Sequence, residues 1–210
     1  MRSNHSGSSC PLPAIRCPET NRQRSARPVN RSRYDGRMGK PRSGKRSVLH
    51  ELLDGKGAHA SPLACVEDLS TELAGSTVSG FPHSVWQILA HLNYWMEYEL
   101  KRIDGQPMPY PARAADSWPK ESKPPSQTAW DREVRRFSRT LQALARLANS
   151  DSEVRRRPVE MTTPAHAEVS NSVEAVLWQI VAHNSYHAGQ IVVLRRILNA
   201  WPPRGGGDTW

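Results

Sequence analysis

Hydrophobic and polar positions follow the period of an α-helix through almost all of residues 47–204. Apolar residues return every three or four positions, which places them on one side of a helix. No convincing run alternates in the way that strand residues do. The pattern predicts an all-α domain over 47–204, with helices at about 47–54, 61–74, 84–103 and 128–149, and a last helix from Asn171 to just before Trp201.

The predicted helix ends carry residues that commonly begin and end helices. Ser84 is followed three positions later by Gln87, and Asn171 by Glu174, and both pairs form a capping signature. Gly75 would supply the C-terminal cap of the second helix. These signals support the boundaries that the hydrophobic period gives.

Residues 105–126 contain six prolines and predict a long irregular connection. A helix of about 20 residues is about 30 Å long, and the connection can run that full length. It therefore favours a crossover between two helical hairpins related by a pseudo-twofold axis. With a short leading helix, the predicted fold is a four-helix bundle.

A near-repeat is the strongest chemical signal. Residues 86–95 and 178–187 share six of ten positions, including the histidine that is His91 in the first copy and His183 in the second. His187 lies four residues after His183, on the same helix face. If the two helices pack across the pseudo-twofold, His91 approaches the same point from the other side. Such a three-histidine cluster is typical of a metal site.

His183 and His187 also fall on the apolar stripe of the last helix, which is formed by Val173, Val176, Ile180, Ile191, Leu194 and Leu198. A buried neutral imidazole needs partners for both ring nitrogens. One metal ion bound between the two histidines would be the partner of one nitrogen of each ring. The alternative is that these are core histidines with ordinary hydrogen bonds. His91 lies at the edge of its own stripe, so its position is less decisive.

Charge is concentrated at the start of the chain. Residues 1–47 hold twelve Lys and Arg against two acidic residues, a net of +10 that leaves −1 for the rest of the +9 chain. The folded domain therefore gives no electrostatic reason to bind nucleic acid. We expect residues 1–46 to be a disordered Arg/Ser-rich tail and 205–210 a flexible C-terminus.

Three interpretations of the tail compete. It contacts nucleic-acid phosphates nonspecifically, it is a targeting segment, or the start is assigned too far upstream, with Met38 as the alternative. The last is favoured. No apolar run reaches the roughly 20 residues that span a bilayer, and no secretory signal is evident, so a soluble cytoplasmic protein is expected.

The three cysteines, Cys10, Cys17 and Cys65, give no disulfide framework. Cys65 lies in a helical pattern of apolar residues, which indicates a core residue rather than a nucleophile. Trp118 and Trp210 could line a site, cover a dimer surface or lie on loops, and the sequence does not choose among these.

Several segments resemble the DinB-like (DinB/YfiT-like) metalloenzyme family over about residues 48–204. The resemblance rests on Ala58-His59, on the run from Pro82 to His91, on the run from His183 to Arg196, and on Trp201-Pro-Pro. It implies a bundle of up-down-down-up topology, often a homodimer, that holds a divalent metal through three histidines. Those ligand positions correspond to His91, His183 and His187, and the basic tail has no counterpart.

Three neutral imidazoles would suit zinc, nickel, iron or manganese, and they would leave a position open for water or a thiolate. Some proteins of this kind resemble S-transferases or isomerases that use a low-molecular-weight thiol, and others resemble metal-dependent hydrolases. We therefore expect an enzyme of either type acting on a small-molecule substrate. A non-catalytic metal-binding stress or interaction protein is the alternative, and nucleic acid is expected only as a partner of the tail.

Residues near the ligands could orient them through their second ring nitrogens. Candidates by position are Glu99, Asn184, Tyr186 and Gln190, each of which could equally be an ordinary polar residue of a helix. His59 matches a position near the site in similar proteins, or is simply a loop histidine. No carboxylate stands beside the histidines as in His-Glu-x-x-His, so the sequence identifies no general base.

Overall fold

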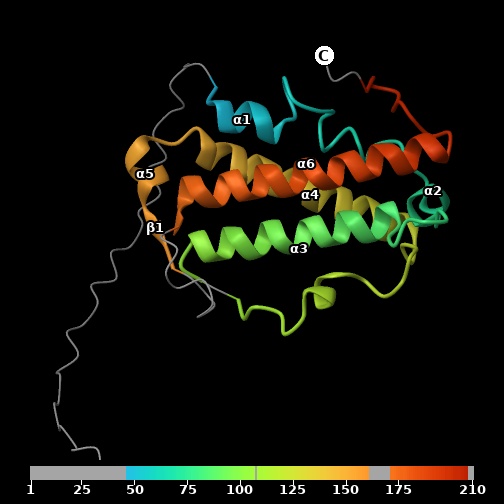
Figure 1. The fold of residues 1–210 in the computed structure, drawn as a ribbon, viewed down its shortest axis with the longest axis horizontal. Helices are drawn as coiled ribbons and strands as arrows, with labels where there is room; N and C mark the ends of the chain where they lie inside the picture. The colour runs from blue at the N-terminus through green and yellow to red at the C-terminus, as the bar shows by residue number, and fades with distance from the viewer. Residues whose placement is uncertain (1–45, 107, 161–170, 208–210) are drawn as a thin grey trace, which may run out of the picture. The chain divides into compact units, whose positions relative to one another are not determined.

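The computed structural model describes residues 46–106, 108–160 and 171–207, within a unit that spans residues 43–210 (Figure 1). The predictions for residues 1–45, for Trp210 and for the end of the C-terminal segment lie outside the described residues. The described part is mostly helical, and its one sheet is a short antiparallel pair in which β1 (Pro158–Val159) faces β2 (Asn171–Ser172).

Three long helices dominate. They are α3 (Val85–Ile103), α4 (Gln127–Ala148) and α6 (Val173–Ile197), close to three of the predicted helices. The remaining helices are short: α1 (Val48–Leu53), α2 (Thr71–Gly75), α5 (Ser152–Arg156) and the 3-10 helix η1 (Ala114–Ser117). The sequence pattern predicted a short leading helix and four bundle helices. The described part of the structure has three of those four as long helices, and the one predicted at 61–74 is not among them.

The predicted cap of α3 is confirmed. The Ser84 hydroxyl accepts a hydrogen bond from the Gln87 backbone N–H, and the Gln87 side chain accepts one from the Ser84 backbone N–H. The predicted start of α6 was wrong by one residue. Ser172, not Asn171, caps that helix by accepting from the Ala175 backbone N–H at 3.1 Å, and both residues belong to β2.

The predicted helix over 61–74 was also wrong. Residues 62–68 form turns, and only Thr71–Gly75 is α-helical. The turns include Asp68 at a positive φ of 60°, and the segment is held in place by Arg195 of α6, which is 1% exposed. Its guanidinium donates to three carbonyl oxygens of this segment, those of Ala64, Cys65 and Glu67, at 2.9–3.2 Å. These oxygens bond to Arg195 rather than continuing a helical ladder.

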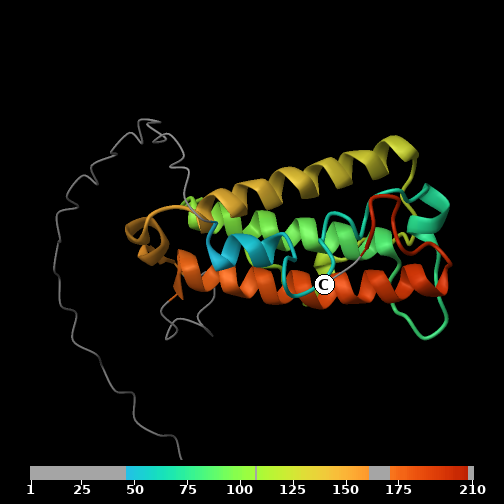
Figure 2. The same cartoon turned by 90° about the horizontal axis from the view of Figure 1, so that it is seen from above.

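Helix directions follow from the long connection. α3 and α4 run the same way, whereas α6 and α1 run the opposite way, and residues 104–126 return the chain along the length of α3 (Figures 1 and 2). α3 packs against both α4 and α6, and α1 lies against α4 and α6. The core between them includes Leu89, Met96, Phe137, Leu177 and Leu194, all buried.

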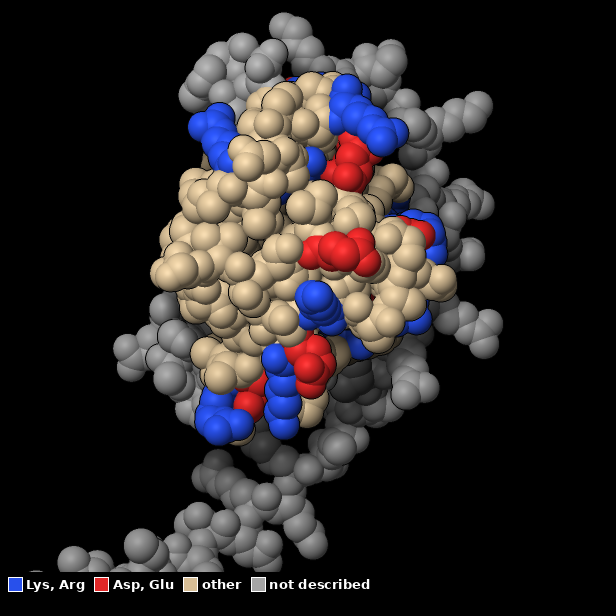
Figure 3. Space-filling model, turned by 90° about the vertical axis from the view of Figure 1, so that its right-hand side faces the viewer, with Lys and Arg blue, Asp and Glu red and all other residues tan. Residues whose placement is uncertain are grey.

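The helices of the described part include none with the length and apolarity needed to cross a membrane. Viewed from the end where α2 and the C-terminal end of α6 lie, much of the surface is uncharged, and basic and acidic side chains occur close to one another (Figure 3).

Candidate metal centre

Two helices bring three histidines together. α3 contributes His91, and α6 contributes His183 and His187, which are one turn apart as the spacing predicted. One ring nitrogen of each lies within 4.8 Å of the others. His91 and His187 are buried, at 6% and 5% exposed, and His183 is half-buried. The group could hold a metal ion.

The contact with Ser117 favours one tautomer of His91. The Ser117 hydroxyl donates its only proton to the Ala114 carbonyl oxygen at 2.7 Å. It can therefore only accept from Nδ1 of His91, which lies 2.9 Å away. A neutral His91 then carries its proton on Nδ1 and has a free lone pair on Nε2.

The same logic applies to His187. Its Nδ1 lies 2.6 Å from Oε1 of Gln190, an amide oxygen that only accepts. His187 is therefore protonated on Nδ1 and has its lone pair on Nε2. Gln190 was a predicted neighbour of the site, and the structure places it in direct contact with a histidine.

His183 and His91 lie close together within the cluster. Nε2 of His183 lies 3.2 Å from Nε2 of His91. Two nitrogens that each lie about 2.0–2.1 Å from one tetrahedral ion are separated by about 3.3 Å. The observed separation fits two ligands of a shared ion, and it equally fits an N–H···N hydrogen bond between the two rings.

Electrostatics keep the rings neutral. Burial, with neighbouring histidines adding to it, lowers the pKa of His91 to about 3 and that of His183 to about 4. Burial also lowers the pKa of His187, against the effect of Gln190. All three imidazoles are thus uncharged at neutral pH, which is the state that a metal ion binds.

Trp118 forms one wall of the centre. Its ring stacks on His91 at 3.8 Å between centroids and on His83 at 3.7 Å, with planes within 11° of parallel in both cases. Two rings stacked this closely on one indole must occupy opposite faces, so Trp118 lies between the histidines. It also meets His187 edge-on at 5.7 Å. Trp118 therefore lines the site, which the sequence left open.

Ser117 and His83 were missed by sequence reasoning. Ser117 belongs to η1 in the proline-rich connection, where no period marks a functional residue. His83 precedes the cap of α3, and its Nδ1 is buried with no hydrogen-bond partner among the described residues. The Ser117-Trp118 pair within a polar, proline-rich stretch was the one available signal.

Two other predicted neighbours have partners elsewhere. Glu99 forms an ion pair with Arg102 at 2.8 Å, and burial raises its pKa against that attraction. Asn184 is 2% exposed and its amide nitrogen donates to the sulfur of Met96 at 3.3 Å. Neither contact involves a histidine of the cluster.

Tyr186 and His59 are the last two predicted neighbours of the site. In the described contacts, Tyr186 touches a histidine of the cluster, and His59 is bonded to other residues. Tyr186 is 66% exposed, and its ring meets the edge of His187 at 5.0 Å. His59 is bonded through Nε2 to the Ser185 hydroxyl and through Nδ1 to the Ala60 carbonyl oxygen, both at 2.8 Å. Ser185 lies on the other side of α6 from His183 and His187, because it is about half a helical turn away.

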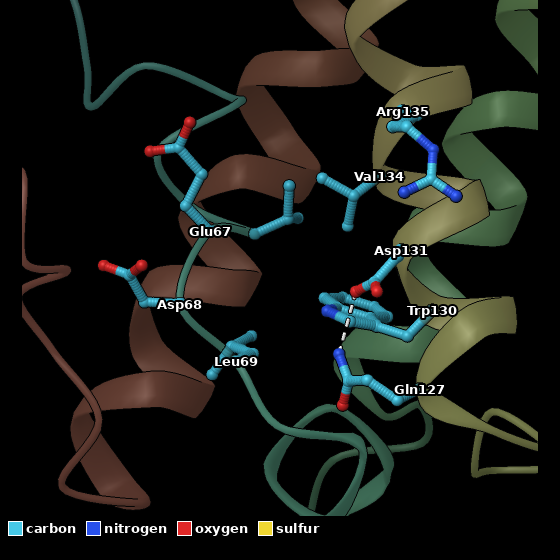
Figure 4. Close-up of a pocket in the computed structure, with 9 residues that line it drawn as sticks. Glu67, Asp68, Leu69, Gln127, Trp130, Asp131, Val134 and Arg135 are labelled. Atoms are coloured by element: carbon cyan, nitrogen blue, oxygen red, sulfur yellow. Dashed lines mark hydrogen bonds between the residues drawn. The ribbon is translucent and has the colours of Figure 1, made fainter.

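Cys65 is fully buried, and burial raises the pKa of its thiol to about 12 against the pull of Arg195. Its prediction as a core residue is confirmed. The structure also has a shallow pocket of about 510 Å³ between residues 66–69 and the first turns of α4 (Figure 4). Its polar lining is Glu67, Asp68, Asp131 and Arg135, with Gln127 bonded to Asp131, and the three histidines lie outside it.

Comparison with known proteins gives a single finding. A family model described as the DinB superfamily matches residues 58–191, a range that contains all three clustered histidines. Neither the curated proteins nor the solved structures give a match. The matched range covers well over half of the 210 residues, and this chain therefore belongs to the DinB superfamily.

Proposed function

We propose that this protein is a metal-dependent enzyme in which His91, His183 and His187 bind one divalent transition-metal ion. The observation that carries the proposal is the convergence of the three rings, two of which have an outer hydrogen-bond partner on Nδ1. Ser117 and Gln190 hold the protons of His91 and His187 on Nδ1, which leaves Nε2 of both rings free to donate. Outer hydrogen bonds of this kind are typical of histidines that ligate metals.

The donor set fits a transition metal. Three uncharged imidazole nitrogens suit zinc, nickel, iron or manganese, and the group contains no carboxylate of the kind that calcium or magnesium prefers. Three protein ligands also leave a position open, which distinguishes catalytic from purely structural sites. A metal held here would lower the pKa of a water or thiol bound at that position.

The remaining residues of the centre position and shield the ligands. Trp118 covers one face of His91 and keeps water from that side. His183 is the most exposed of the three rings, so small molecules reach the centre beside it. We interpret α1 and residues 54–69 as a shortened first member of a four-helix bundle with up-down-down-up topology.

Transfer of a low-molecular-weight thiol is the reaction that these residues support best. No Asp or Glu joins the histidine group within the described residues, so a carboxylate base for activating water is missing there. A thiol loses its proton far more readily than water does and needs less help. Its sulfur would bond to an electrophilic carbon, the leaving group would depart with the bonding electrons, and the thiol proton would pass to solvent.

Metal-dependent hydrolysis is the second candidate. His83 is the observation for it, because its Nδ1 has no described partner and burial lowers its pKa, which leaves the ring uncharged and able to accept a proton at neutral pH while making it a weaker base. Its ring lies across Trp118 from His91. The third candidate is a metal-binding stress or interaction protein without turnover, which the missing carboxylate base also supports.

One experiment separates the three. The full chain, loaded in turn with zinc, nickel, iron and manganese, is assayed with cysteine and chlorodinitrobenzene, and separately with nitrophenyl acetate. Metal-dependent turnover that requires the thiol and is lost in His187→Ala supports S-transfer. Turnover of the ester without thiol supports hydrolysis instead. Bound metal with neither activity would contradict an enzyme acting on these substrate classes and favour the third candidate.

A further inference from the structure

The side of α4 that faces away from the core is lined with arginines. The helix has seven exposed positions, and every charged one among them is an arginine: Gln127, Thr128, Arg132, Arg135, Arg139, Gln142 and Arg146. We call Arg132, Arg135, Arg139 and Arg146 the α4 row. With Gln142 they follow one line at spacings of three and four residues, opposite the buried stripe of the helix. Figure 2 shows α4 along one edge of the helical domain.

The acidic residues of α4 do not neutralise this row. The helix has two, and both have other partners. Asp131 accepts a hydrogen bond from Gln127 at 2.8 Å (Figure 4). Glu133 accepts from Arg136 at 3.0 Å and from Asn93 of α3 at 2.9 Å. Within the part of the chain that the structure describes, no guanidinium of the α4 row forms a hydrogen bond or an ion pair.

Exposed charges of both signs alternate elsewhere in the domain. In residues 104–123 they are three acids and three bases: Asp104, Asp116, Glu121, Arg113, Lys120 and Lys123. The α4 row instead sets like charges three and four residues apart, as in Arg132 with Arg135 and Arg135 with Arg139, and such pairs destabilise a helix. Folding therefore gives no reason for the pattern, whereas a bound polyanion would remove the repulsion. The net charge of −1 outside residues 1–47 conceals this basic strip.

We propose that the α4 row binds the phosphate backbone of double-stranded DNA without sequence preference. From Arg132 to Arg146 the helix rises about 21 Å. Over that length each strand of a duplex carries about six phosphates. A guanidinium binds a phosphate with two parallel hydrogen bonds. The amide of Gln142 and the hydroxyl of Thr128, on the same face, are further donors of the kind that contact phosphates.

The composition of the exposed face selects among polyanions. Proteins bind single strands largely by stacking bases on aromatic side chains, and helices that lie on membranes insert large apolar residues. None of the seven exposed positions of α4 is aromatic or apolar. The major groove of B-form DNA is about 12 Å wide and admits an α-helix, so the long arginine side chains can reach the phosphates along it. The major groove of double-stranded RNA is deep and narrow. Duplex DNA is therefore the partner that the face fits best.

The salt dependence of DNA binding by the full chain tests the proposal. Anisotropy of a fluorescein-labelled duplex of about 20 base pairs is measured at about 50 to 200 mM salt. Each phosphate contact contributes about 0.9 to the slope of log affinity against log salt. Changing all four row residues to Gln, which also favours a helix, should reduce that slope by about 3 to 4 and weaken binding at least about 10-fold at 50 mM salt. Residues 1–47 contribute equally to each measurement, because every variant carries them.

A matched variant separates the α4 row from net charge. Changing Lys120, Arg156, Arg196 and Arg204 to Gln removes the same charge from exposed positions outside α4. This control should change the slope by less than about 1, because it removes no row contact. Equal losses in the two variants, or a row variant that binds the duplex as the wild type does, would overturn the proposal. Circular dichroism confirms that both variants keep their helices.

A gain of binding tests the row without removing anything from it. Gln142→Arg fills the one uncharged position on the line between Arg132 and Arg146 and should make the slope steeper by about 0.9. Gln179→Arg adds the same charge at an exposed position of α6 and should leave the slope unchanged. Equal slopes for Gln142→Arg and wild type would contradict the assignment.

Vesicles of phosphatidylcholine with phosphatidylserine, and single-stranded DNA, are the competing polyanions. A row variant that loses affinity for either of these while it keeps its affinity for duplex DNA would refute the choice of partner. The histidines of the metal centre lie on α3 and α6, and the α4 row contains none of them. The binding assay needs neither metal nor turnover, so its outcome does not depend on the proposed function.

Discussion

Replacing Ser117 with alanine should weaken metal binding without unfolding the protein. The substitution removes the only described acceptor for Nδ1 of His91, which lies 2.9 Å from the serine hydroxyl. His91 can then move its proton to Nε2, where Nε2 of His183 is 3.2 Å away and can accept it. Metal binding to Nε2 requires the proton to return to Nδ1, where the buried N–H of the variant has no acceptor.

The size of the effect follows from that unmade hydrogen bond. A buried donor without an acceptor costs about 1–3 kcal/mol, and His91 is only 6% exposed. Because about 1.4 kcal/mol corresponds to a factor of ten, we expect the metal dissociation constant to rise roughly 10- to 100-fold. Competition with a chromophoric chelator measures it directly.

Ser150→Ala is the matched control. Like Ser117, Ser150 donates to the carbonyl oxygen three residues earlier, that of Leu147 at 2.6 Å, and its hydroxyl makes no described contact with the three histidines. Its loss should leave metal affinity unchanged. Equal affinities for wild type and Ser117→Ala, with helicity preserved, would refute the reasoning about the His91 tautomer.

Three further outcomes follow. Gln190→Leu should weaken metal binding by a similar 10- to 100-fold, since it removes the 2.6 Å acceptor of His187; chelator competition that finds no change would contradict this. In chelator-stripped protein, the free energy of unfolding should fall as the pH drops below about 6.5. Unfolded histidines take up protons in that range, whereas folded His91, with its pKa at about 3, does not. Urea titrations should therefore show that the free energy of unfolding depends less on pH in His91→Phe than in the wild type. Arg195→Met should lower the free energy of unfolding by about 3 kcal/mol or more, since it leaves four backbone carbonyl oxygens without their donor; a urea midpoint equal to that of wild type would contradict the role given to Arg195.

The features that the sequence predicted are those that local periodicity controls. α3, α4 and α6 carry a regular apolar stripe and lie close to their predicted bounds. His183 and His187 converge because a spacing of four residues places side chains on one helix face. His91 joined them through the near-repeat, which relates the two helices that carry the cluster.

The features that the sequence did not predict depend on contacts between distant segments. Residues 61–74 have a helical pattern, but Arg195, about 130 residues later in the sequence, donates hydrogen bonds to three carbonyl oxygens of this segment. Ser117 meets His91 across 26 residues, from a connection whose prolines obscure any period. Neither contact leaves a local mark in the amino-acid pattern.

The central claim is that three histidines form one metal site, and metal content per folded chain tests it most directly. Full-length protein is loaded with metal, dialysed and measured by elemental mass spectrometry beside His183→Ala and His187→Ala, with helicity checked by circular dichroism. The account predicts close to one ion per wild-type chain and its loss from both variants while they remain folded. Wild-type protein that takes up no metal, or folded variants that retain it, would contradict the claim.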